Sequence, residues 1–162
     1  MWSKLKLTKV KQRKSILYTE HIFKGGRMIP AELEKCILQA QSENKAPFFV
    51  NATSGSTVLG AYDDLDALAD VCKKHSVWLH VDACWGGSAI LSRKLKHLMK
   101  GSDKVDSIAW NPHKMVGAPL QTSPFIVRHK GMLHQTNSAN ATYLFQQVIH
   151  LLSKVIFDEF FF

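Results

Sequence analysis

The sequence predicts an α/β fold with a mainly parallel sheet and flanking helices. Two observations lead to this fold class. Apolar runs of about five residues, the length of buried strands, alternate along the chain with longer amphipathic stretches. Clusters of polar residues follow several of these runs. The 162 residues correspond in length to one domain with a sizeable core.

The first elements are a helix and a strand. Pro30 suits the first turn of a helix, and the apolar residues behind it recur on one face: Leu33, Ile37 and Ala40. The run at 46–50, APFFV, follows a polar turn and has the composition of a buried strand.

A second helix is predicted to begin within 63–66, where three acids suit the positive end of the helix dipole. Its expected buried stripe is Leu65, Leu68, Ala69 and Cys72. The run at 77–81 predicts the next strand, with Asp82 at its carboxyl end. Gly86 and Gly87 are expected to open a further helix towards Lys100. Two last strands are predicted at 106–110 and 124–128.

Polar clusters lie at the carboxyl ends of three predicted strands, at 53–57, at Asp82 and at 111–114. In open α/β sheets, ligands bind outside these strand ends. The sequence therefore predicts a ligand site at this edge of the sheet.

The net charge of +8 is concentrated at one end. Residues 1–27 hold eight of the 21 Lys and Arg residues but only one acid, Glu20. The stretch Lys9–Lys14 is compatible with nucleic-acid binding or with a solvated tail. Because the remaining chain is nearly neutral, no nucleic-acid partner is expected.

The cysteines Cys36, Cys72 and Cys84 form no CxxC pair, which predicts a reducing compartment and neither disulfide nor metal site. No apolar stretch is long enough to cross a bilayer. We therefore expect a cytoplasmic protein without a membrane partner.

Two residues at the predicted edge could carry chemistry. Asp82 follows an apolar strand and is expected to have little water around it, so that its charge needs a partner; the alternative is a helix cap. Lys114 lies near Trp110, Met115 and Val116. Desolvation there would favour a nucleophilic amine suited to a Schiff base, whereas the alternative is a solvated surface lysine.

Four segments, in order and spacing, resemble the group II pyridoxal-phosphate (PLP) dependent decarboxylases, a family that includes glutamate, cysteine sulfinate, aspartate and aromatic amino-acid decarboxylases. They are TSGSTVLGAYD (53–63), SVWLHVDACWGGSAILSRK (76–94), DSIAWNPHK (106–114) and TYLFQQ (142–147). The resemblance implies part of the large domain of PLP fold-type I.

The resemblance also implies roles for single residues. Lys114 would form the Schiff base with the cofactor aldehyde, and Asp82 would pair with the pyridine nitrogen, so these two are the candidate catalytic residues. The strings STVLGAYD and ACWGGSAIL resemble the cysteine sulfinate and glutamate branch, which implies an acidic amino-acid substrate. Arg93 and Arg128 are unassigned candidates for its side-chain acid.

Four further cofactor-binding residues follow from the resemblance. Asn111 and His113 would lie on the phosphate side, and Thr57 near the cofactor and the substrate. Cys84 occupies a position whose small side chain packs against one face of the ring. A turn with a structural histidine is the alternative for Asn111 and His113.

The expected organisation is a basic, non-matching segment 1–25, a partial PLP-binding domain 26–147 and a non-matching apolar tail 148–162. We expect a piece of a longer protein or a partial gene model, with little activity by itself, from a family that works as a homodimer. Two alternatives stay open: another fold-type I PLP enzyme, such as an aminotransferase, and a non-catalytic PLP-binding remnant.

Overall fold

The computed structural model describes residues 23–137, so the predictions for Lys9–Lys14, for 142–147 and for 148–162 lie outside the described residues. The chain divides into two compact units, 1–128 and 129–162. In the second unit, the described helix is α4 (Met132–Asn137). The elements of the first unit are β1 (Phe23–Lys24), β2 (Arg27–Met28), α1 (Pro30–Ser42), β3 (Phe49–Thr53), α2 (Leu65–Lys74), β4 (Trp78–Ala83), the 3-10 helices η2 (Gly86–Leu91), η3 (Lys96–Met99) and η4 (Ser102–Lys104), β5 (Ser107–Trp110), α3 (Pro112–Met115) and β6 (Phe125–Val127).

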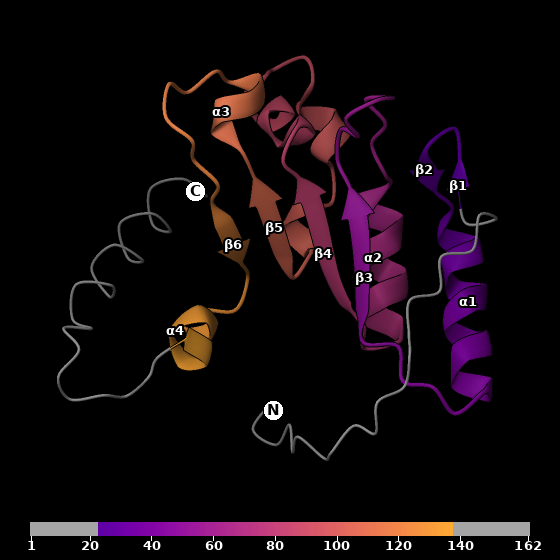
Figure 1. Ribbon diagram of the computed structural model, residues 1–162. Helices are drawn as coiled ribbons and strands as arrows, with labels where there is room; N and C mark the ends of the chain where they lie inside the picture. Colours follow the sequence, from indigo (N-terminus) through magenta and orange to yellow (C-terminus); the bar gives the residue numbers. More distant parts are fainter. Residues whose placement is uncertain (1–22, 138–162) are drawn as a thin grey trace, which may run out of the picture. The chain divides into compact units, whose positions relative to one another are not determined.

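The main sheet has the strand order β3-β4-β5-β6 (Figure 1). β4 pairs in parallel with β3 and with β5, whereas β6 runs antiparallel to β5. A separate hairpin joins β1 to β2. The prediction of a mainly parallel sheet with flanking helices is confirmed.

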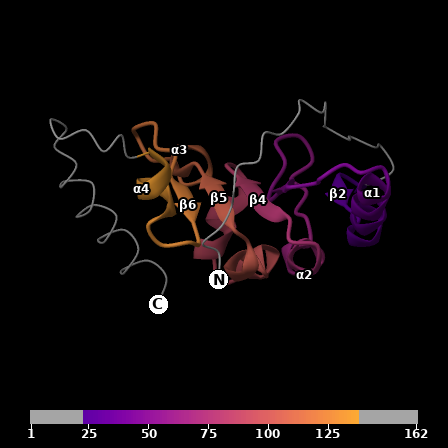
Figure 2. The same cartoon turned by 90° about the horizontal axis from the view of Figure 1, so that it is seen from below.

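The two faces of the sheet differ in what covers them. Alternate residues of a strand point to opposite faces, and one face of β3 and β4 packs into the core. Figure 2 shows α2 on one side of the strands. The buried residues of this layer include Val50, Ala52, Leu79, Val81, Leu65 and Leu68. The opposite face carries Phe49 and Phe125, each about half exposed.

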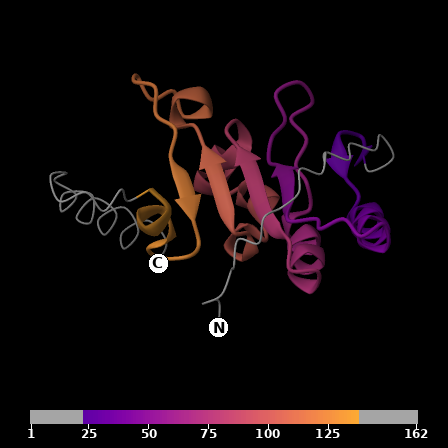
Figure 3. The same cartoon turned by 60° about the horizontal axis from the view of Figure 1, so that its bottom comes forward.

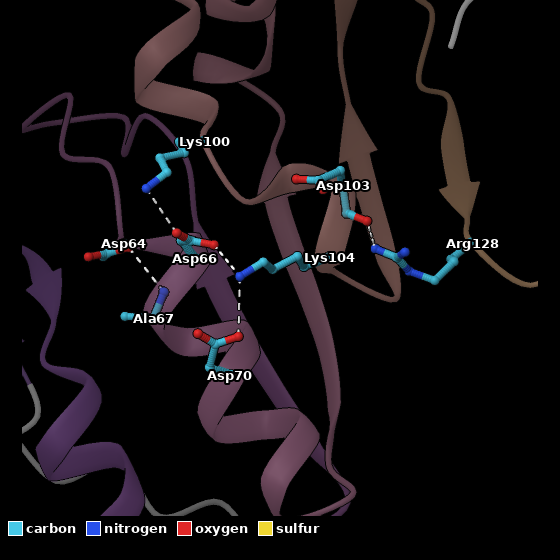
Figure 4. A network of polar contacts seen from close by, with 8 residues as sticks. All are labelled: Asp64, Asp66, Ala67, Asp70, Lys100, Asp103, Lys104 and Arg128. Carbon is cyan, nitrogen blue, oxygen red and sulfur yellow. Dashed lines mark hydrogen bonds and ion pairs between the residues drawn. The ribbon is translucent and has the colours of Figure 1, made fainter. Parts of the chain in front are cut away.

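Helix α2 begins where the sequence predicts it. The Asp64 side chain accepts a hydrogen bond from the Ala67 N–H at 3.1 Å and caps the helix. Asp66 forms ion pairs with Lys100 and Lys104, which hold the η3–η4 segment against α2 (Figure 4). The predicted stripe of Leu65, Leu68, Ala69 and Cys72 is buried, as is the stripe of α1.

Asp63 has a different role from the other two acids. It is buried, and its carboxylate accepts hydrogen bonds from the Met28 N–H at 2.6 Å and from the Thr53 N–H at 2.7 Å. The prediction that Asp63 serves the helix dipole is therefore incomplete, because this carboxylate joins β2 to β3.

Three predicted elements need correction. β3 spans 49–53 instead of 46–50, and β4 spans 78–83 instead of 77–81. The apolar character of 46–48 does not come from a buried strand, since Phe48 is 72% exposed. The predicted helix from Gly86 to Lys100 is replaced by the short 3-10 helices η2 and η3. No helix within 23–137 has both the length and the apolar character that a membrane span requires.

Candidate active site

The loops that follow β3, β4 and β5 lie at the same end of the sheet (Figures 1 and 3). Asp82 lies in the penultimate position of β4, in register with Thr53 of β3 and Ala109 of β5. The expectation of little water around Asp82 is wrong, because its side chain points to the uncovered face of the sheet and is exposed. Its Oδ1 accepts a hydrogen bond from the Cys84 N–H at 3.0 Å. Asp82 therefore closes the turn after β4 and does not cap a helix.

Lys114 lies in α3, the single turn that follows β5. Pro112 begins this turn, and the Lys114 N–H donates to the Asn111 carbonyl at 3.0 Å. The lysine is half-buried, but Met115 and Val116 are each 51% exposed, so these two do not form the apolar surroundings that the sequence suggested.

The Cys84 thiol links the two candidate catalytic residues. Burial raises the pKa of this thiol, and the neighbouring Asp82 carboxylate raises it further, whereas the Lys114 ammonium lowers it. Both charges therefore act on the same sulfur atom, one from β4 and the other from the turn after β5. The structure brings Asp82, Cys84 and Lys114 together.

The loop after β3 is fixed to the turn after β4. The Ser54 N–H donates to the Asp82 carbonyl at 2.8 Å, and the Tyr62 hydroxyl donates to the Gly86 carbonyl at 3.1 Å. Gly55 has a φ of +80°, and a Cβ at this position would lie 2.5 Å from the Cα of Gly86. These contacts bring the loop close to Asp82.

Thr57 lies further along this loop and is exposed. The hydrogen bonds of the described residues do not join Thr57 to Asp82 or Lys114. The structure therefore places Thr57 at the correct edge of the sheet without bringing its side chain into the cluster of Asp82, Cys84 and Lys114.

Asn111 and His113 flank Pro112 beside Lys114. Asn111 is half-buried and makes no capping hydrogen bond to α3 with its side chain. His113 Nδ1 lies 3.0 Å from the Thr122 nitrogen and 2.8 Å from the Thr122 oxygen, so this histidine closes the 113–122 loop. If Nδ1 accepts from the Thr122 N–H, the ring proton resides on Nε2, which is then a donor for a ligand. His113 can therefore close the loop through Nδ1 and bind a ligand through Nε2.

The sequence did not reveal four residues near this site. Trp85 lies beneath Lys114, with the Nζ atom 5.4 Å from the ring centre. On the uncovered face, the Trp78 indole and the His80 ring both bind the Ser107 hydroxyl, at 2.9 and 2.8 Å. The string HVDACW held a signal for Trp85 and His80, because both lie within three residues of Asp82. No local signal marks Ser107.

The residues present fit a PLP group. A pyridine nitrogen needs an anionic partner and the cofactor aldehyde needs an amine, and the structure supplies Asp82 and Lys114 within reach of the same thiol. Asn111, His113 and Thr57 add an amide, an imidazole and a hydroxyl at the same edge of the sheet, which are donor groups suited to a phosphate.

Comparisons with known proteins agree with this arrangement. Residues 8–162 match the family described as the pyridoxal-dependent decarboxylase conserved domain. Acidic amino acid decarboxylase GADL1 of Bos taurus is 57% identical over 123 residues, which are 75% of this chain and 24% of that protein. Cysteine sulfinic acid decarboxylase of Mus musculus is 54% identical over 123 residues, with 75% and 25% covered.

Solved structures with similar folds include members of the same group of enzymes by name. A crystal structure of mouse CSAD has a TM-score of 0.66 at 54% identity and covers 68% of this chain and 24% of its own. Oryza sativa TDC with PLP has a TM-score of 0.62 at 34% identity, with 64% and 22% covered.

The chain spans about a quarter of the length of these relatives. The expected cofactor is confirmed by the pyridoxal-dependent family and by a structural neighbour that contains PLP. The family match spans residues 8–162 without a break at 25/26 or 147/148. It does not test the domain boundaries predicted at these two places, which stay predictions. On this evidence, the chain belongs to the pyridoxal-dependent decarboxylase family.

Proposed function

We propose that the protein containing this chain decarboxylates an acidic amino acid (cysteine sulfinate, glutamate or aspartate) with PLP as its cofactor. The observation that carries the proposal is that two neighbouring strands bring Asp82 and Lys114 to the same turn: Asp82 Oδ1 accepts from the Cys84 N–H at 3.0 Å, and the Lys114 Nζ lies 5.4 Å from the ring of the next residue, Trp85. The names of the similar proteins, an acidic amino acid decarboxylase and a cysteine sulfinic acid decarboxylase, support the substrate class.

The chemistry divides between the cofactor and the chain. When bound, PLP would supply an electron sink for the electron pair that stays on Cα when the substrate carboxylate departs as CO2. Asp82 holds a proton at the pyridine nitrogen, because its negative charge stabilises the cationic ring. The Lys114 amine binds the cofactor aldehyde before the substrate arrives and after the product leaves. The Cys84 thiol, close to Asp82, would contact one face of the ring.

The remaining predicted residues would bind the phosphate and orient the ring. His113 would offer Nε2–H when its Nδ1 accepts from the Thr122 N–H, and Asn111 has an amide that makes no capping bond. The exposed Thr57 hydroxyl would approach from the loop after β3. Each of these groups donates a hydrogen bond, and bonds to a charged phosphate are stronger than neutral ones.

Arg128 is not proposed as the partner of the substrate's side-chain acid. Its guanidinium donates to the Val105 carbonyl at 2.8 Å and to the Asp103 carbonyl, so it holds the start of β5 (Figure 4). We further propose that the protein is a homodimer in the cytoplasm. Support comes from the family resemblance for the dimer, and from the three cysteines, none of which forms a disulfide, for the compartment.

The test of the cofactor site uses the 162-residue chain with PLP and borohydride, which reduces the linkage to a stable pyridoxyl-lysine. Mass spectrometry should find the label on the peptide that contains Lys114. Lys114→Ala should remove the label, whereas Lys96→Ala, at an exposed position of η3, should leave it. An equal label in Lys114→Ala would exclude the proposed role of Lys114.

The test of the substrate class uses the longer protein that contains this chain, at the full length of its curated relatives. Release of labelled CO2 from cysteine sulfinate, glutamate and aspartate should exceed release from aromatic amino acids. Faster release from an aromatic substrate would contradict the proposed substrate class while leaving the cofactor site intact. Light scattering on the same preparation measures whether it is a dimer.

A further inference from the structure

Three polar side chains form a connected chain on the uncovered face of the sheet. The Trp78 Nε1–H donates to the Ser107 Oγ at 2.9 Å, and the His80 Nδ1 lies 2.8 Å from the same oxygen. Ser107 is only 2% exposed, so water has little access to its hydroxyl. His80 and Ser107 are direct partners in the pairing of β4 with β5, which fixes this geometry.

The donors and acceptors of these three side chains are compatible with an uncharged His80. An indole N–H can only donate, so Trp78 occupies an acceptor position of the Ser107 hydroxyl. The single hydroxyl hydrogen of Ser107 is then available for the His80 Nδ1. With Nδ1 as the acceptor, the ring carries its proton on Nε2 and is uncharged.

The surroundings of His80 also favour the uncharged ring. The Phe49 ring stacks on it with 6.0 Å between centroids and 20° between planes, and the Phe125 ring lies 5.7 Å away. These residues line an aromatic groove of about 490 Å³, together with Phe48, Trp78 and Ser107. Burial lowers the pKa of His80 by more than the Asp82 charge and a hydrogen bond to the Ser107 backbone together raise it.

His80 and Asp82 are two residues apart in β4, so they share a face and lie about 7 Å apart along the strand. The neighbours of His80 from β3, β5 and β6 are Phe49, Ser107 and Phe125, which do not titrate near neutral pH. Among the described residues, Asp82 is the charged group that acts on His80.

We propose that His80 is a positioning residue for Asp82, kept uncharged by its burial against two phenylalanine rings, with the Ser107 hydroxyl as the partner of its Nδ1. An imidazolium at this position would be a cation that competes for the Asp82 carboxylate. An uncharged His80 leaves that carboxylate available to the ring nitrogen of PLP. This inference rests on the proposed function, since it assigns His80 a task towards the same cofactor.

The proposal predicts that protonation of His80 weakens the binding of PLP. By linkage, PLP binding then lowers the proton affinity of His80 by the same factor. Acidification should therefore weaken PLP binding as the pH falls through the pKa of His80. Conversely, removal of the Asp82 charge should lower the pKa of His80 further.

The first experiment uses the 162-residue chain without PLP. Nitrogen-15 NMR of His80 should show an unprotonated Nδ1 and a protonated Nε2 at neutral pH. Asp82→Asn should lower the pKa of His80 and leave that of His97, at an exposed position of η3, unchanged. A protonated Nδ1 at neutral pH, or a His80 pKa that is the same in Asp82→Asn, would overturn the proposal.

The second experiment measures PLP affinity by quenching of tryptophan fluorescence from about pH 7.5 to about pH 5. The dissociation constant of the unaltered chain should rise severalfold more than that of His80→Phe, which keeps the ring packing. His97→Phe is the control and should match the unaltered chain. Titration of the cofactor itself is common to all three and cancels in the comparison.

The outcomes separate the two proposals. Absence of PLP binding at every pH would contradict the cofactor site that the proposed function assigns to this chain, while the NMR experiment still decides the protonation of His80 and its coupling to Asp82. Binding with one pH profile for His80→Phe and the unaltered chain would overturn the His80 proposal and leave the PLP site standing.

Discussion

The Nζ atom of Lys114 lies 5.4 Å from the centre of the Trp85 ring. The two residues come from different strand ends, Lys114 from the turn after β5 and Trp85 from the turn after β4. The end of β4 therefore carries Asp82, the candidate partner of the pyridine nitrogen, and the turn that follows carries the aromatic ring beside the candidate lysine. An ammonium over an indole face is stabilised by about 0.5–1 kcal/mol at an exposed site.

Trp85→Leu should make the Lys114 amine more reactive towards an acylating reagent. Loss of the stabilising ring corresponds to an increase in acylation rate of about two- to fivefold. The measurement is time-resolved acetylation of the cofactor-free chain, followed on the Lys114 peptide by mass spectrometry. Trp85→Phe keeps an aromatic face and should give a smaller increase. An unchanged rate in Trp85→Leu would show that the contact has no energetic weight.

Alkylation of Cys84 should report the two charges beside it. Because its pKa is raised, Cys84 is mainly an unreactive thiol at neutral pH, and alkylation should accelerate as the pH rises towards this raised pKa. Asp82→Asn removes an influence that raises the pKa, so alkylation at about pH 8 should become severalfold faster, tenfold per pKa unit. Lys114→Met should slow it.

Cys72 is the internal control for this measurement. Burial raises its pKa to about 12, and its side chain is 1% exposed, so it should stay unmodified in the folded chain. Mass spectrometry of the separate cysteine peptides distinguishes the sites. Equal alkylation of Cys84 in Asp82→Asn and the unaltered chain would contradict the proximity of Asp82 to this thiol.

The elements that the sequence predicted well are those with one buried side and clear ends. Helix α2 has an acid at its cap, a stripe that ends at Cys72 and two lysines in its last turn, and each signal is local. The strand predicted at 46–50 failed because Phe48 and Phe49 are apolar but exposed, on a face that α2 does not cover. An apolar run by itself does not indicate which face of a sheet is buried.

The candidate site divides in the same way. The apolar runs before Asp82 and Lys114 made both residues candidates, and the family resemblance of the strings around them gave their roles, whereas neither signal revealed their exposure. The bond between His80 and Ser107 depends on the pairing of β4 with β5, which relates residues 27 positions apart. Register of this kind is set by packing of the whole sheet, so no local pattern reveals it. Gly86 likewise suggested a helix, but its packing against Gly55 shapes the turn.

Gly55→Ala should destabilise the chain more than Gly60→Ala, although both glycines lie in the same loop with positive φ. At Gly60 a Cβ meets nothing within 4 Å, so only the left-handed backbone costs free energy, about 1–2 kcal/mol. At Gly55 the contact with Gly86 adds about 1–3 kcal/mol from overpacking. Urea unfolding of both variants measures the difference. An equal loss of unfolding free energy in the two variants would indicate that the loop of Gly55 can move away from the turn of Gly86 without cost.

The carboxylate of Asp63 should contribute more to stability than that of Asp64, its neighbour in sequence. Asp63 is 5% exposed and binds the backbone N–H groups of Met28 and Thr53, whereas Asp64 is an exposed helix cap. Asp63→Ala leaves two donors without their acceptor, which should lower the free energy of unfolding by about 2–5 kcal/mol. Asp64→Ala should cost about 1 kcal/mol.

The same pair of variants tests whether Asp63 supports the candidate site. Thr53 precedes the loop that contains Thr57, so loss of the Asp63 contact should loosen this loop as well as the β2–β3 connection. Hydrogen exchange should show faster exchange at the Met28 and Thr53 amides in Asp63→Ala and unchanged exchange there in Asp64→Ala. PLP affinity should fall in the first variant and stay constant in the second. Equal stability of the two variants would show that water replaces the Asp63 carboxylate without loss, and that the other contacts of the loop after β3, such as those of Ser54 and Tyr62, are sufficient to hold it.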